Sequence, residues 1–127
     1  MNGFFLVALG GAIGAAGRYG AGLAATRLMP GAWPWGTFFV NATGSFAMGL
    51  VVGWLALKGA GGDNGVKLFL ATGVLGGFTT FSAFSLEVVE MMRADAMGRA
   101  AGYAGASVGL GVASLFFGLW IARRVFA

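Results

Sequence analysis

The chain has 127 residues, of which 58% are hydrophobic and 9% are charged, and its mean hydropathy is +0.85. These proportions lie outside the range of soluble globular domains and predict an integral membrane protein. The sequence contains no cysteine and no histidine, which excludes disulfides and thiolate chemistry and argues against the usual zinc or haem ligands. No nucleophile stands near a base, so we do not expect an enzyme.

Four segments are apolar and long enough to cross about 30 Å of hydrocarbon as helices. They span residues 2–28, 36–58, 66–92 and 99–122. The first begins without a basic residue and is too long for a cleaved signal peptide, so we expect it to remain as a helix. The connections are short and rich in turn-forming or charged residues. The expected fold is therefore all-α, with residues 1–127 forming a single four-helix transmembrane domain in the cell membrane.

The net charge of +4 does not come from one basic patch, because the basic residues lie singly or in pairs near the segment ends. This scatter argues against nucleic acid as a partner. If the helices alternate in direction, the two membrane faces receive similar numbers of basic residues: Lys58, Lys67, Arg123 and Arg124 on one, and Arg27, Arg93 and Arg99 on the other, with Arg18 nearer the second. Orientation normally follows an excess of Lys and Arg on the cytoplasmic side. The balance predicts insertion in both directions and an antiparallel homodimer; a single orientation with a weak bias is the alternative.

Glycine is unusually frequent, with 25 residues. Small residues spaced by four allow membrane helices to approach closely. Four such pairs occur: Gly10/Gly14, Gly49/Gly53, Gly73/Gly77 and Gly105/Gly109. We expect most of them to serve helix packing.

Three of the predicted helices each carry a polar stripe. The stripes are Thr37, Asn41 and Ser45 on the second helix, Thr80, Phe84 and Glu87 on the third, and Tyr103, Ser107 and Ser114 on the fourth, with Gly111 between the two serines. Single Ser and Thr side chains in membranes often bond back to their own helix. So many donors at one depth nevertheless favour a wet or ion-lined path around Asn41 and the run from Thr79 to Ser85.

The chemistry of these residues suits an anion. Hydroxyl and amide protons solvate anions, and aromatic rings present a positive edge, so Phe81 and Phe84 are candidate ligands as well as packing residues. Arg18 lies within a helix, where it either adds a positive field to an aqueous vestibule or extends to the interface. Glu87 either sets a vestibule field or pairs with Arg18.

The third segment contains Gly76-Gly77-Phe78-Thr79-Thr80, which is a poor continuous helix. A break there would free backbone carbonyls near the middle of the membrane, and such carbonyls suit a hard cation such as Na⁺. A pair of packing glycines without a break is the alternative.

Three motifs resemble those of the Fluc (CrcB) fluoride channels. They are Gly11-Ala12-Ile13-Gly14-Ala15-Ala16-Gly17-Arg18-Tyr19, Gly36-Thr37-Phe38-Phe39-Val40-Asn41-Ala42-Thr43-Gly44-Ser45-Phe46 and Gly76-Gly77-Phe78-Thr79-Thr80-Phe81-Ser82-Ala83-Phe84-Ser85. Their order and spacing and the chain length also match. The sequence departs from the family pattern at Phe78, where Leu is commoner, and at Ala83, where Thr is common.

The resemblance implies a dual-topology antiparallel homodimer in a bacterial inner membrane, with two pores that let F⁻ leave the cytoplasm passively and so relieve fluoride toxicity. It places Asn41, Phe81 and Phe84 on the ion path. It also implies a polar track of Thr80 and Ser82 that continues through Tyr103 and Ser107. A structural Na⁺ at the dimer centre would be held by the backbone carbonyls of Gly76 and Thr79.

Two other classes of function remain as alternatives. A small proton-coupled multidrug or cation transporter can also be a four-helix dual-topology dimer, but it needs a carboxylate in its first helix, and this first helix has none. A non-transporting assembly subunit would explain the glycines but not the donors at Asn41 and Thr80.

Overall fold

The computed structural model describes residues 2–59 and 64–127, and within them every regular element is a helix. Four helical stretches are long and apolar enough to span a membrane: Asn2–Leu28, Trp35–Leu57, Asn64–Arg93 and Met97–Phe126. The first two are α1 (Asn2–Leu28) and α2 (Trp35–Leu57), and the last is α6 (Met97–Phe126). The predicted all-α fold with four long apolar helices is confirmed, and the predicted ends differ from the observed ends by a few residues.

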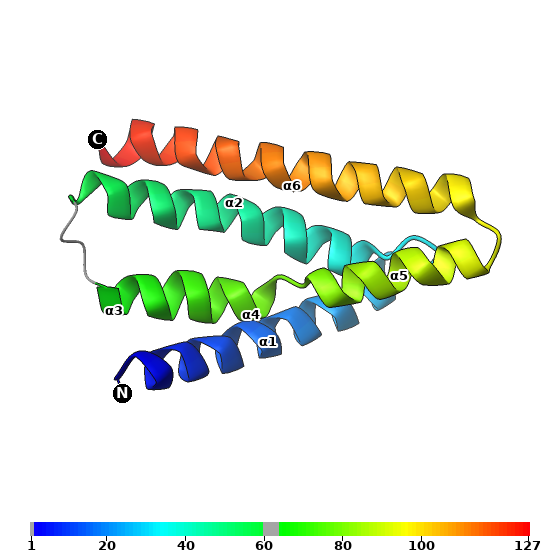
Figure 1. The fold of residues 1–127 in the computed structure, drawn as a ribbon, viewed down its shortest axis with the longest axis horizontal. Coiled ribbons are helices and arrows are strands. Elements are labelled where there is room, and N and C mark those ends of the chain that lie inside the picture. Colours follow the sequence, from blue (N-terminus) through cyan, green and yellow to red (C-terminus); the bar gives the residue numbers. More distant parts are fainter. Residues whose placement is uncertain (1, 60–63) are drawn as a thin grey trace.

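The third stretch is divided into four elements. It begins with α3 (Asn64–Lys67), continues as a π-helix, η1 (Leu68–Leu75), and then as α4 (Gly76–Phe78) and α5 (Phe81–Arg93). The chain therefore bends between α4 and α5, as Figure 1 shows. The sequence analysis expected the bend but not the π-helical segment, whose wider turns are uncommon and often occur at functional positions.

The helices pack in two close pairs. In Figure 1, α2 and α6 run side by side along their length, while α1 crosses η1 and α4. The N- and C-termini lie at the same end of the molecule. Four successive crossings would bring both termini to one face of a membrane.

Glycine backbones make both helix pairs possible. A Cβ atom built on Gly10 would lie 2.5 Å from the Phe69 carbonyl oxygen, and one on Gly77 would lie 2.6 Å from the Gly11 carbonyl oxygen. In the other pair, a Cβ on Gly49 would lie 2.9 Å from the Leu119 amide nitrogen. Real side-chain carbons do not approach so closely, so these contacts require glycine. Three of the four predicted glycine pairs therefore pack within the chain. The fourth pair does not, because a Cβ atom built on Gly105 or Gly109 would have no neighbour within 4 Å.

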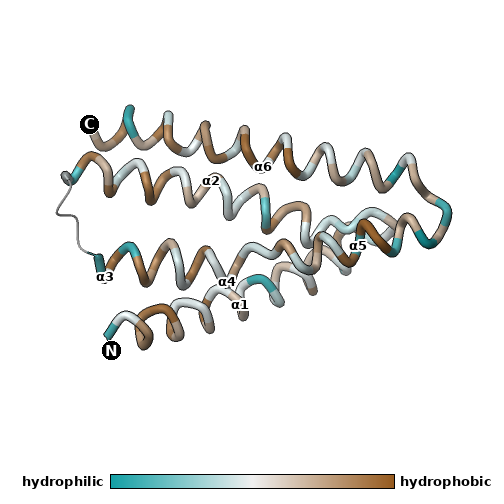
Figure 2. The backbone as a smooth tube through the Cα atoms, in the orientation of Figure 1, coloured by the Kyte–Doolittle hydropathy of each residue, from teal (hydrophilic) through white to brown (hydrophobic). Residues whose placement is uncertain are grey.

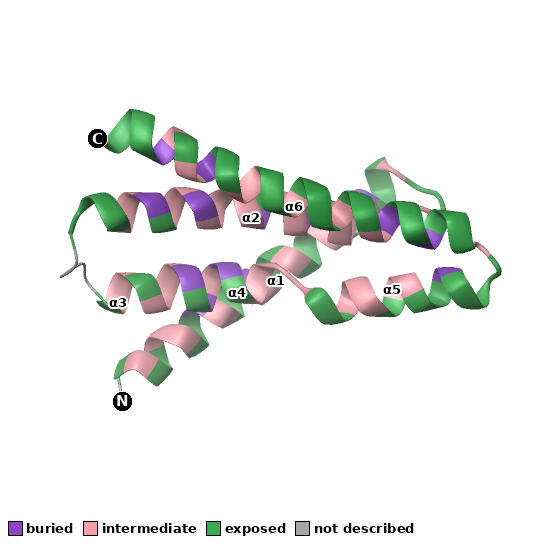
Figure 3. Ribbon diagram, turned by 45° about the horizontal axis from the view of Figure 1, so that its top comes forward, coloured by how far each residue is buried: buried purple, intermediate pink, exposed green. Residues whose placement is uncertain are grey.

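Little of the chain is buried within one copy. Figure 2 shows apolar residues along all four long helices, and Figure 3 shows that exposed and half-buried residues cover most of them. Tyr103 is the only large side chain of the described residues that is fully buried. It lies in a small core with Met91 and Ala100, against which Trp33, Phe38 and Phe84 pack. The rest of the apolar surface needs lipid or another protein surface as its partner.

Candidate functional site at the break in the third helix

The break itself lies at Thr79 and Thr80. Both residues are extended, with φ/ψ of −85°/157° and −149°/121°. Thr80 then caps α5, because its hydroxyl accepts a hydrogen bond from the Ala83 amide at 3.2 Å. Threonine is a favoured N-cap residue, which explains why the helix restarts at Phe81. Gly76 and Gly77 remain helical in α4, so the predicted break is present but lies after the glycines.

Asn41 of α2 holds the extended residues in place. Its Nδ2 donates to the Thr80 carbonyl at 3.0 Å, and its Oδ1 accepts from the Thr80 amide at 2.8 Å. The carboxamide thus bonds to both the amide and the carbonyl of Thr80, as the backbone of a neighbouring strand does in a β-sheet. An Asn side chain has two N–H donors, so one remains for another partner. Asn41 therefore holds the break in place, and within the described residues its second N–H has no partner.

The break removes the helical amide partners of the carbonyls just before it, and those of Gly76 and Thr79 are among them. In a continuous helix the Thr80 amide would reach the Gly76 carbonyl, but here it donates to Asn41. The Ala83 amide would likewise reach the Thr79 carbonyl, but here it donates to the Thr80 hydroxyl. Gly76 and Thr79 are the two residues whose carbonyls were predicted to bind Na⁺. Carbonyl oxygens released in this way suit a hard cation, so the residues present fit such an ion.

Arg18 of α1 joins the same region from the other side. It is half-buried, and its Nε donates to the Gly77 carbonyl at 3.1 Å. It also lines a hollow of about 320 Å³ together with Thr37 and Thr80. Arg18 therefore brings a positive charge close to the break, and its vestibule role stays a prediction.

The two phenylalanines lie next to each other at the start of α5, with ring centroids 5.8 Å apart. Phe81 is 78% exposed, whereas Phe84 is half-buried and lies 5.3 Å from the Tyr103 ring. Phe81 also lines a second hollow of about 320 Å³ with Asn41, Ser45 and Thr80. The Phe81 ring and the donor groups of Asn41 and Thr80 therefore border one space.

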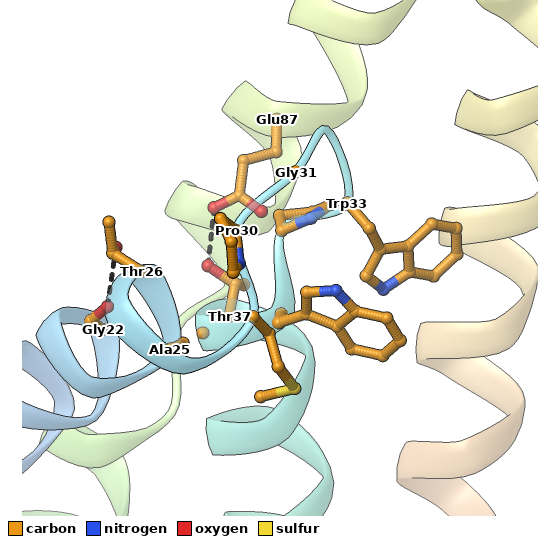
Figure 4. A pocket seen from close by; sticks show the side chains of 12 residues that line it. Gly22, Ala25, Thr26, Pro30, Gly31, Trp33, Thr37 and Glu87 are labelled. Atoms are coloured by element: carbon orange, nitrogen blue, oxygen red, sulfur yellow. Dashed lines mark hydrogen bonds between the residues drawn. The ribbon is translucent and has the colours of Figure 1, made fainter.

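Glu87 connects three helices. One of its carboxylate oxygens accepts from the Thr37 hydroxyl of α2, and the other accepts from the Tyr103 hydroxyl of α6 at 2.7 Å. Figure 4 shows Glu87 and Thr37 at the edge of a hollow of about 390 Å³, formed where α1 ends and α2 begins. Both oxygens of Glu87 are bonded to hydroxyls and Arg18 is bonded to a carbonyl, so the structure does not pair these two charges.

The comparison with known proteins agrees with these features. Residues 5–119 match the family described as CrcB-like protein, Camphor Resistance (CrcB). The chain belongs to the CrcB family.

Curated members resemble this CrcB chain over its whole length. A protein of Hyphomonas neptunium named fluoride-specific ion channel FluC is 66% identical over 127 residues, which cover 100% of both chains. Proteins of the same name from Caulobacter vibrioides and Phenylobacterium zucineum are 50% and 51% identical, again with 100% of both chains covered.

The CrcB fold brings together only part of the predicted polar track. The Thr80 and Ser82 hydroxyls lie 3.4 Å apart. Tyr103, in contrast, bonds to Glu87, and its ring centroid lies 5.3 Å from that of Phe84. The Ser107 oxygen is buried and forms no hydrogen bond within the described residues. Within the described residues, no hydrogen bond joins the Thr80 and Ser82 pair to Tyr103 or Ser107.

Thr37 was absent from the predicted site residues, although it contacts Glu87 directly. The signal was present in the spacing of Thr37, Asn41 and Ser45, since residues four apart share one helix face. That spacing could not identify the partner, because Glu87 comes from a different helix fifty residues later.

Proposed function

We propose that this protein is a fluoride-specific ion channel that allows passive export of F⁻ across the membrane. Full-length identity of 66% to a protein named fluoride-specific ion channel FluC is the observation that carries the proposal. The broken third helix with its surrounding donors supports it.

The proposed path passes between the aromatic rings and the donors at the break. F⁻ loses part of its hydration shell and gains contacts from the free N–H of Asn41 and the hydroxyls of Thr80 and Ser82. The edges of Phe81 and Phe84 present partial positive charge to the anion. Arg18 raises the local anion concentration from the neighbouring hollow. Tyr103 and Ser107 continue the path towards Glu87.

The functional unit is proposed to be an antiparallel homodimer. Phe81 is exposed although it borders the donor groups, and Gly105 and Gly109 of α6 have open space around them. A second copy would cover such surfaces and enclose the path. The even division of basic residues between the two ends supports opposite orientations.

A structural Na⁺ at the dimer centre is also proposed, bound by the carbonyls of Gly76 and Thr79. The support is the loss of both helix amide partners at these positions. The cation would supply positive charge that holds two chains together, and it would stabilise the assembled state by binding it selectively. Flux coupled to an imposed Na⁺ gradient would contradict this structural role.

The test is a flux assay with purified protein in liposomes loaded with KF. Valinomycin is added, and external F⁻ is followed with a selective electrode. We expect rapid F⁻ release, little Cl⁻ release from KCl-loaded vesicles, and no dependence on a Na⁺ gradient. Silent vesicles that contain folded, assembled protein would refute the proposed function.

Two substitutions test the aromatic part of the path. Phe81→Ile and Phe84→Ile remove the ring edges but keep apolar volume, so we expect each to lower F⁻ flux while assembly persists. Size-exclusion chromatography checks assembly in the same preparations. Undiminished flux in either variant would remove that residue from the path.

A further inference from the structure

Most hydroxyl groups of the described helices have partners. Four of them bond back to the carbonyl four residues earlier, which is the usual way to satisfy a hydroxyl inside a membrane helix. These four are Thr26, Thr43, Thr79 and Ser85. Thr37 bonds to Glu87, and Thr80 pairs with Ser82.

Three serines differ from this pattern. Within residues 2–59 and 64–127, no hydrogen bond is formed by the hydroxyls of Ser45, Ser107 and Ser114. Ser45 follows Asn41 by one helical turn, so back-bonding to the Asn41 carbonyl would be the ordinary arrangement. A hydroxyl that leaves this bond unmade inside a membrane keeps its proton available for another acceptor.

The serines of α6 form an interrupted row. Ser107, Gly111 and Ser114 lie three or four residues apart and therefore share one helix face. Gly111 carries no side chain, so the row lacks a hydroxyl in its middle. A Cβ atom built on Gly111 would have one neighbour within 4 Å, the Ser45 hydroxyl oxygen at 3.7 Å. Ser45 of α2 thus places its hydroxyl beside the gap in α6.

Ser45 also borders the space next to the break. It lines the hollow of about 320 Å³ together with Asn41, Thr80 and Phe81. One helical turn, about 5.4 Å, separates Ser45 from Asn41 along α2. An anion that leaves the Asn41 donor therefore meets the Ser45 hydroxyl as the next unpaired donor on this helix.

We propose that Ser45 is an ion-pathway residue, which supplies from α2 the hydroxyl that α6 lacks at Gly111 and so joins the donors at Asn41 and Thr80 to the serines of α6. This inference rests on the proposed fluoride channel function. The ion would pass from the carboxamide to the Ser45 hydroxyl and then to Ser107 or Ser114. In this proposal the ion needs a hydroxyl at this point in space, and a hydroxyl carried by α6 would serve as well as one carried by α2.

The decisive experiment moves the hydroxyl from one helix to the other. Ser45→Ala is expected to lower F⁻ efflux from KF-loaded liposomes about tenfold, since one hydrogen bond to an ion is lost. Adding Gly111→Ser to this variant restores a hydroxyl at the same place, so efflux should recover most of the loss. Adding Gly111→Ala instead supplies the carbon without the hydroxyl and should not restore efflux.

Two further variants control for folding and for hydroxyl loss in general. Thr43→Val removes a hydroxyl that is bonded to the Phe39 carbonyl on the same helix, and it should leave efflux unchanged. Ser45→Thr keeps the hydroxyl and should conduct within about threefold of the original rate. All variants are compared at equal amounts of assembled protein, measured by size exclusion.

The outcomes separate this inference from the proposed function. If the unsubstituted protein releases no F⁻, the channel function itself fails. If it conducts and Ser45→Ala conducts equally well, Ser45 is not in the pathway. Equal recovery with Gly111→Ala and Gly111→Ser would also overturn the proposal, because it would assign the effect to packing.

Discussion

Gly10 offers the sharpest test of how the helices pack. A Cβ atom at Gly10 would lie 2.5 Å from the Phe69 carbonyl oxygen and 2.9 Å from both the Gly73 Cα and the Val74 amide nitrogen. Ordinary contacts between such atoms are about 3.3–4.0 Å. All three neighbours are backbone atoms, so no side chain can rotate away. Gly10→Ala must therefore push α1 and η1 apart by about 1 Å.

The neighbouring glycine provides a matched control. Gly11 is the next residue of the same helix, and a Cβ atom there would meet nothing within 4 Å. Both substitutions gain the same helix propensity, about 0.8–1 kcal/mol for Ala over Gly. The difference between them therefore reports the steric cost alone. Overpacking of this kind costs about 1–3 kcal/mol, which corresponds to an apparent melting temperature lower by about 4–12 °C.

The assay is thermal unfolding of the purified protein in detergent, followed by size-exclusion chromatography after heating. We expect Gly10→Ala to melt below Gly11→Ala by the amount given, and the F⁻ efflux of its folded fraction to fall because η1 leads directly into the break. Equal melting temperatures for the two variants would refute the proposed packing of α1 against η1.

Three other predictions concern the break, the turn before α6 and the cation. Thr80→Ala removes the hydroxyl that caps α5 and should lower stability by about 1 kcal/mol, whereas Thr80→Ser should retain it; chemical denaturation of the two variants measures the difference. Asp95 has a φ of 58°, which glycine adopts without steric cost, so Asp95→Gly should raise the melting temperature, and an unchanged or lower value would contradict the assigned turn. Replacing Na⁺ by N-methyl-D-glucamine should lower the melting temperature of the assembled protein if the carbonyls of Gly76 and Thr79 bind the cation; identical melting curves in the two salts would argue against the site.

The residues predicted for the ion path show which parts of the site a sequence pattern can predict. Asn41, Thr80 and Phe81 are separated by up to forty residues, yet they line one hollow. The polar stripes placed Asn41 and Thr80 on helix faces because the helical period is local and fixed, and Phe81 follows Thr80 directly in the sequence. The partners of Arg18 and Glu87 could not be obtained in this way. Each of these charges lies within reach of several helices, and only their relative rotation selects the Gly77 carbonyl for one and two hydroxyls for the other.

Composition and segment length by themselves determined that this protein is a four-helix membrane protein. The glycine and threonine residues of the third segment predicted that its helix is interrupted. These properties follow from the cost of exposing polar backbone to lipid and from the local preferences of glycine and threonine. The tertiary structure decided where the third helix breaks, because Asn41 of another helix must satisfy the Thr80 backbone. It also decided that η1 widens against α1, and that Ser45 stands beside the gap at Gly111. Such contacts depend on how two helices are rotated against each other, and this rotation is set by the sum of many side-chain contacts across the pair.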